Sequence, residues 1–181
     1  MNRIALASFA CLSLAACASG TMMMSKPYDQ AMLPAAVQVP AGHKVAMETV
    51  GTGDITYECR GKANMPGQYE WVFVGPDAKL WDRAGKQVGK YYGPPATWEN
   101  MDGSRVTATQ VAVAPGMAGS IPLQLVKANP AMGMGAMTGV TYIQRVATQG
   151  GAAPAMPCDA GNRGARQVVQ YQADYIFYKA M

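Results

Sequence analysis

Charged residues and histidine are scarce in this sequence. Asp, Glu, Lys and Arg make up 14% of the 181 residues, whereas apolar residues make up 50%. Disordered chains combine low hydrophobicity with high net charge, so this composition excludes a disordered acidic or basic protein and is typical of one domain with a buried core. The only histidine is His43, near the expected start of the folded part. A Ser-His-Asp or Cys-His catalytic site elsewhere in the chain would lack its base.

Long apolar runs and phosphate-binding glycine motifs are also absent. No run reaches the roughly 20 residues of a membrane-spanning helix, which excludes a polytopic membrane protein. Neither the GxxxxGK motif nor the GxGxxG motif precedes a helical pattern, so no nucleotide cradle is expected. The net charge of +4 is small and spread along the chain. We therefore expect no nucleic-acid partner and no cofactor.

The N-terminus is typical of an exported bacterial lipoprotein. Arg3 provides a positive start, and the apolar run that follows is too short to span a membrane. That run ends in Leu14-Ala15-Ala16-Cys17, which resembles a lipobox. We therefore expect a signal peptide at residues 1–16, lipidation of Cys17, and a flexible tether over residues 17–36. The alternative is an ordinary signal peptide, cut after a site of the A-x-A type.

Four cysteines are present, and only two of them are expected in the folded part. Cys11 leaves with the signal peptide and Cys17 takes the lipid, which leaves Cys59 and Cys158. An exported chain with two remaining cysteines predicts one disulfide in an oxidising compartment. A thiolate metal site lacks partners, because the sequence contains no CxxC motif.

Residues 37–181 predict a single β-rich domain, because apolar and polar residues alternate with a period of two. In the last strand expected, Val169, Tyr171, Ala173, Tyr175 and Phe177 share one face. Glycine and proline turn signals, among them Gly51-Thr52-Gly53-Asp54 and Gly75-Pro76-Asp77, separate eight to ten such runs. Residues 128–138 and 149–167 are expected to be long loops. The fold class expected is all-β, an antiparallel β-sandwich or barrel with long loops.

Several separate motifs occur in an order that resembles a known family. They are Tyr57-Glu58-Cys59, Trp71–Ala78, Asp102-Gly103-Ser104, Tyr142–Val146 and Cys158-Asp159-Ala160. Over about residues 33–178 they resemble a bacterial and fungal family of secreted or lipoprotein-like domains of unknown function. The resemblance implies an exported domain and no particular activity. Lys90 stands where the family pattern usually has a histidine.

The densest group of aromatic and polar residues contains Trp98, Glu99 and Asp102. Arg145 is the cation that we expect beside them. As a ligand site, Trp98 would stack on a sugar or another planar molecule while Glu99 and Arg145 form hydrogen bonds to it. The alternative is structural: a salt bridge from Arg145 to Glu99 or Glu58 that orders the fold.

Three functions remain open from the sequence. The first is a non-enzymatic, lipid-anchored module of the cell envelope that binds a glycan or an envelope protein, and Ala18 after the lipidated cysteine favours the outer membrane. The second is a hydrolase that acts on a glycan through two carboxylates. The third is a periplasmic Cu(I)-binding protein that uses Met132, Met134 and Met137. Two facing carboxylates would favour the second, and three converging thioethers would favour the third.

Overall fold

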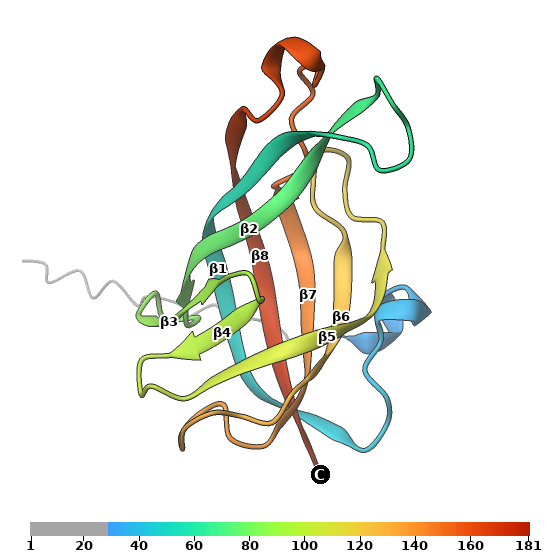
Figure 1. Cartoon of the computed structure of the whole chain (residues 1–181). Helices are drawn as coiled ribbons and strands as arrows, with labels where there is room; N and C mark the ends of the chain where they lie inside the picture. The colour runs from blue at the N-terminus through green and yellow to red at the C-terminus, as the bar shows by residue number, and fades with distance from the viewer. Residues whose placement is uncertain (1–28) are drawn as a thin grey trace, which may run out of the picture.

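The protein is a closed ring of antiparallel strands. A computed structural model describes residues 29–181. The strands are β1 (His43–Gly61), β2 (Tyr69–Trp81), β3 (Gln87–Tyr92), β4 (Thr97–Asn100), β5 (Arg105–Ala114), β6 (Leu123–Ala128), β7 (Val140–Gly150) and β8 (Arg166–Ala180). Each strand pairs with its neighbour in the chain, and β8 closes the ring onto β1 (Figure 1). The all-β prediction is confirmed, and the architecture is the barrel.

Helical structure is limited, in the described residues, to three 3-10 turns. They are η1 (Gln30–Met32), η2 (Ala35–Val37) and η3 (Ala160–Asn162). Within the same residues, no helix has the length and apolar character needed to cross a membrane.

Two of the turns that glycine signals predict are absent, because Gly51 and Gly75 lie inside β1 and β2. A Cβ atom on Gly51 would overlap the ring of Tyr175, and one on Gly75 would overlap the carbonyl oxygen of Gly93. These glycines permit close approach between strands and do not reverse the chain. The other turn signals, from Pro66-Gly67 to Pro115-Gly116, do fall between strands.

Side chains from all sides of the ring fill its interior. In β8, the predicted alternation is observed: Tyr171, Ala173, Tyr175 and Phe177 are buried inside the barrel. They pack with aliphatic and aromatic residues of the other strands, among them Ile55, Leu80, Trp98, Val106 and Ile143. The interior is therefore a continuous apolar core over most of its length.

The outer face of β5–β8 is covered by the first described residues. The segment that contains η1 and η2 lies along the wall of the barrel (Figure 1, blue). Val37 is completely buried and belongs to a cluster with Ala114 and Leu125. The side-chain amide of Gln30 donates a hydrogen bond of 3.1 Å to Gln144. Residues 29–36 therefore differ from the flexible tether expected over 17–36, because these contacts hold them against the barrel.

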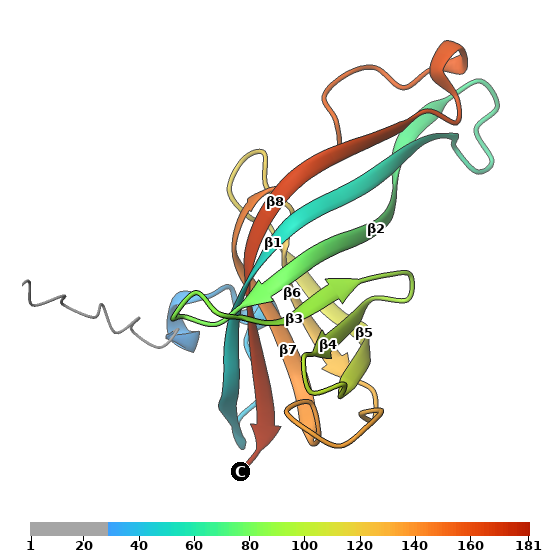
Figure 2. The same cartoon turned by 90° about the vertical axis from the view of Figure 1, so that its left-hand side faces the viewer.

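The bent ends of β1, β2 and β8 extend beyond the ring (Figure 2). There the loop between β7 and β8 is joined to β1 by a disulfide between Cys59 and Cys158, with 5.5 Å between their Cα atoms. The predicted disulfide is confirmed. The amide of Cys59 also donates to the carbonyl of Ala165, and the amide of Gly164 donates to the carbonyl of Cys59. The ring, its core and the covering segment all lie within residues 29–181, so a protein made of this stretch keeps every contact described here.

Candidate functional site

A cavity of about 320 Å³ opens on the barrel interior. Six consecutive strands each contribute one of its principal lining residues: Phe73 (β2), Tyr91 (β3), Trp98 (β4), Gln110 (β5), Gln124 (β6) and Arg145 (β7). Because side chains alternate between the two faces of a strand, only the inward-facing residue of each strand reaches this space. The volume lies at the lower end of the range for small-molecule sites.

One wall of the cavity is aromatic. The rings of Tyr91 and Trp98 are stacked, with 4.5 Å between their centroids and 20° between their planes. Tyr175 contacts both rings from the core side, at centroid distances of 5.1 and 5.9 Å. Phe73 is 50% exposed at the rim. Tyr91 and Trp98 are almost fully buried, so Phe73 is the ring of this wall that a planar ligand could contact most fully.

Trp98 has a polar atom without a partner. The side chain is 2% exposed, and its indole N–H has no hydrogen-bond acceptor in the described part of the chain. A buried donor that makes no hydrogen bond is uncommon in proteins, because it has lost its water without compensation. This donor belongs to a residue that lines the cavity.

The opposite wall is polar and positively charged. The Nε atom of Arg145 donates a hydrogen bond of 3.1 Å to the carbonyl oxygen of Pro122, and the side chain is partly buried. No carboxylate within residues 29–181 forms an ion pair with it. Beside it, the amide of Gln124 donates to the amide oxygen of Gln110 at 2.7 Å. The cavity thus combines one cation with flat apolar rings.

The positive charge of Arg145 also acts on tyrosine side chains deeper in the barrel. The hydroxyl groups of Tyr171 and Tyr175 are 3.1 Å apart. Burial raises the pKa of both, and of Tyr91, while the positive charge of Arg145 acts in the opposite direction on all three. These phenols are therefore neutral in ordinary conditions and can serve only as hydrogen-bonding groups.

Glu99 lies on the outer face of β4, away from the cavity. Its carboxylate accepts a hydrogen bond of 2.7 Å from the hydroxyl of Tyr92 and forms an ion pair of 3.2 Å with Lys90. The hydrogen bond from Tyr92, followed by that from Lys90, lowers the pKa of Glu99. The ligand site predicted from Trp98, Glu99, Asp102 and Arg145 is therefore divided: only Trp98 and Arg145 line the same cavity.

Asp102 serves the turn between β4 and β5. It accepts a hydrogen bond of 2.6 Å from the hydroxyl of Ser104 and one of 2.7 Å from the amide of Ala136. The predicted salt bridge from Arg145 to Glu99 or Glu58 is absent, since Glu58 pairs instead with Arg60 and Arg166 at 2.8 and 2.9 Å.

The methionines of the loop between β6 and β7 do not form one surface group. Met137 is completely buried in the barrel core, whereas Met134 is 84% exposed and Met132 is 42% exposed. The described residues also contain no cluster of three or more His, Cys, Asp and Glu side chains suited to a metal ion. Nothing in this loop therefore matches the convergence that the Cu(I) hypothesis requires.

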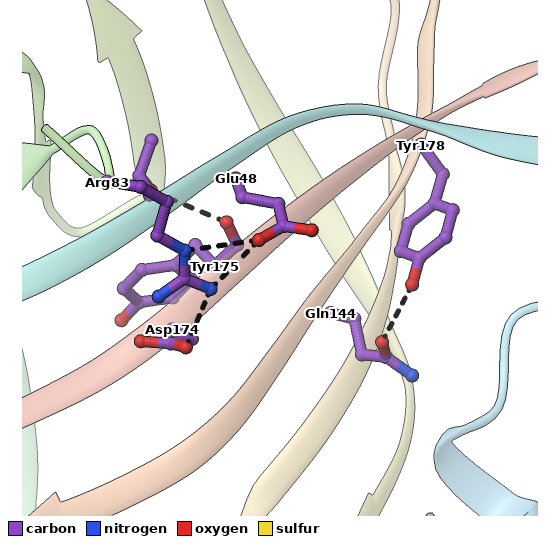
Figure 3. A network of polar contacts seen from close by, with 7 residues as sticks. Glu48, Arg83, Gln144, Asp174, Tyr175 and Tyr178 are labelled. Carbon is purple, nitrogen blue, oxygen red and sulfur yellow. Dashed lines mark hydrogen bonds and ion pairs between the residues drawn. The ribbon is translucent and has the colours of Figure 1, made fainter. Parts of the chain in front are cut away.

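A second polar network lies on the outside of the barrel (Figure 3). Arg83 forms ion pairs with Glu48 at 3.0 Å and Asp174 at 2.9 Å, which connects the β2–β3 turn to β1 and β8. In the same view, the hydroxyl of Tyr178 donates to the amide oxygen of Gln144. These side chains bind one another across strands, so we interpret the network as structural.

Four of the six principal lining residues were not predicted from the sequence: Phe73, Tyr91, Gln110 and Gln124. The alternation in β2 does place Phe73 on the same face as Trp71, which is the one signal available. Selecting that face requires the knowledge that the sheet closes into a ring. Gln110 and Gln124 have no motif, and their place depends on the pairing of β5 with β6.

Comparisons with known proteins give a family and no activity. The sequence model of a family described as Protein of unknown function (DUF3455) matches residues 40–179. This match extends from just before β1 to near the end of β8. A search of curated proteins and a search of solved structures each returned no match.

Proposed function

The chain belongs to the DUF3455 family of proteins of unknown function, and we propose that it is a lipid-anchored binding module of the cell envelope whose barrel holds a small ligand. The observation that carries this proposal is the cavity between the stacked rings of Tyr91 and Trp98 and the guanidinium of Arg145. Enclosed spaces with apolar walls and a few polar groups are the usual form of small-molecule sites.

The same cavity favours binding over hydrolysis. No Asp or Glu of the described chain lines it. The carboxylates of Glu58, Glu99 and Asp174 are instead held in ion pairs outside the barrel. Glycoside hydrolysis requires two carboxylates facing each other across the substrate, one of them free to give up or accept a proton. A binding role needs neither.

The cavity proposal is tested by filling the space. Ala108 lines the cavity, and Ala108→Leu would occupy part of it. The test uses a protein made of residues 29–181. The neutral fluorescent probe N-phenyl-1-naphthylamine should bind the unaltered sequence, and it should bind Ala108→Leu about tenfold more weakly, because the leucine side chain fills part of the cavity. Ala46→Leu, on an exposed part of β1, is the matched control and should leave binding unchanged. Equal affinity of the two variants would contradict the proposal.

The anchor is tested on the full chain. The lipobox and Cys17 lie outside the described residues, and their support is the sequence pattern around Leu14-Ala15-Ala16-Cys17. Incorporation of labelled palmitate and sensitivity of processing to globomycin should both be lost in Cys17→Ser. Cys11→Ser provides the control, since it removes a cysteine of the signal peptide and should leave labelling intact. Labelling that persists in Cys17→Ser would exclude this residue as the site.

A further inference from the structure

We infer that the ligand of the barrel cavity is a planar apolar molecule that carries one anionic group, with the anion bound by Arg145 and the ring against the aromatic wall of the cavity. This inference rests on the proposed binding function and specifies the chemistry of its ligand. It follows from three observations on the lining of the cavity: the charge, the unpaired donor and the shape of the aromatic wall.

The charge of Arg145 lacks a counter-ion in the described structure. Arg60, Arg83 and Arg166 each form an ion pair with a carboxylate at 2.8 to 3.0 Å. Arg145 is the arginine that lines the cavity, where it is partly buried, and only its Nε atom has an acceptor in the described residues. Partial burial of an unpaired cation is unfavourable, and an anion bound there would offset this cost. Two parallel N–H groups of a guanidinium also match the geometry of a carboxylate, sulfonate or phosphate.

The unpaired donor of Trp98 points to the same kind of ligand. The indole N–H is buried and has no acceptor among residues 29–181, and Trp98 is one of the residues that line the cavity with Arg145. The lining therefore includes a second residue with a donor-only polar group, and its one charged residue is a cation. Such a set of groups selects a molecule rich in hydrogen-bond acceptors.

The aromatic wall determines the shape of the remaining part of the ligand. Phe73 is half exposed at the rim, whereas Tyr91 and Trp98 stack on each other at 20° and are nearly buried. Flat rings offer a large contact area to another flat ring and little to a branched or spherical group. With about 320 Å³ available, the site suits a molecule of two or three fused or linked rings and excludes a folded polymer chain.

A pair of probes separates the two parts of this inference. 8-Anilino-1-naphthalenesulfonate and N-phenyl-1-naphthylamine share the same ring system, and only the first carries an anion. In a protein made of residues 29–181, Arg145→Gln should weaken binding of the sulfonate about tenfold or more, because charge-assisted hydrogen bonds are lost. The same substitution should change binding of the amine by less than about twofold. Arg163→Gln removes the same charge from an exposed site outside the cavity and should affect neither probe.

Two further measurements test the inference even if Arg145→Gln fails to fold. Trp98→Phe keeps an aromatic ring and removes the N–H, so it should weaken binding of the sulfonate more than binding of the amine. In the unaltered protein, added salt should weaken binding of the sulfonate and leave binding of the amine unchanged, because ions screen the interaction of the sulfonate with Arg145. Thermal unfolding of each variant shows whether the barrel is intact.

The possible failures are distinguishable. If the sulfonate binds Arg145→Gln as tightly as the unaltered protein, while Ala108→Leu still weakens the amine, the anionic ligand is excluded and the binding cavity stands. If neither probe responds to Ala108→Leu, the cavity is not a binding site, and both the proposed function and this inference are overturned.

Discussion

At the scale of single residues, Asp102 shows how a candidate ligand group can be a structural one. Its two oxygens receive hydrogen bonds from the amide and hydroxyl of Ser104 and from the amide of Ala136. These bonds, led by that from the Ser104 hydroxyl, hold the pKa of Asp102 below its usual range. One carboxylate thereby connects the β4–β5 turn to the methionine-containing loop, and this loop is more ordered than its glycines suggest.

We predict that Asp102→Asn lowers the free energy of unfolding at neutral pH. Because the pKa of Asp102 is lower in the folded state, its contribution to stability is present above the unfolded pKa of about 4 and is lost as the pH falls through the folded value. The difference between the variant and the unaltered protein should therefore shrink as the pH falls below about 4. Urea unfolding across this range measures it, with the exposed Asp54→Asn as control. A difference that is independent of pH would contradict the assignment.

Two of the four residues predicted for a ligand site, Trp98 and Arg145, line the same cavity. Trp98 and Glu99 are neighbours in the sequence, which suggested one site, but they project from opposite faces of β4. Trp98 enters the barrel, and Glu99 meets Tyr92 and Lys90 outside it. Arg145 lines the cavity with Trp98 because β4 and β7 belong to one ring, a proximity that no local pattern encodes.

At the scale of strands, glycine has an unexpected role in this protein. β1 continues through Gly51 and Gly53, where the sequence signals predicted a turn. A Cβ atom on Gly53 would overlap the carbonyl oxygen of Asp77 and the Cα atom of Ala78 on β2. Turn signals identify residues that tolerate unusual geometry, and they do not distinguish a reversing chain from two strands in close contact.

We predict that Gly53→Ala destabilises the protein by about 1–3 kcal/mol, because strand backbones must move apart to admit the methyl group. Gly61→Ala, in the same strand, is the matched control. Its nearest neighbour would lie 3.9 Å away, so its effect should stay within about 0.5 kcal/mol. Denaturant unfolding of both variants gives the comparison. Similar effects of the two substitutions would show that close packing does not explain Gly53.

At the scale of the whole molecule, the disulfide joins the loop between β7 and β8 to β1. The bridge joins positions separated by 99 residues, and the loop that carries Cys158 lies beyond the ring (Figure 2). In the chain-entropy description, such a bridge restricts the unfolded state. The gain adds to the stability that the closed ring already has.

We predict that Cys59→Ser or Cys158→Ser lowers the free energy of unfolding by about 2–5 kcal/mol. The double variant should be no less stable than either single variant, because the two thiols act as one unit. Unfolding with denaturant measures the loss, and thiol counting on the denatured, unreduced protein checks the bridge itself. Two free thiols in protein purified from an oxidising compartment would argue against it.

The sequence predicted the all-β class, the β8 alternation and the disulfide, because each depends on local period or on a count of cysteines. It did not distinguish a sandwich from a barrel, because the strands of both architectures show the same alternation of apolar and polar residues. The pairing of β1 with β8 decides between them, and it joins His43 to Ala180 across almost the whole domain. The packing of η1 and η2 on the outer wall could not be predicted either, because it also joins residues far apart in the sequence and follows no local period.

The pairing of β1 with β8 also has a consequence for the order of events during synthesis. Of the eight strands described, β8 is the last to be made, and contacts between residues so far apart in the chain form slowly. Until β8 joins β1, the ring is open and the aromatic wall lacks the support of Tyr175. A chain that stops before β8 therefore has no finished cavity, and occupancy of that cavity would report that β8 has been made and the ring has closed.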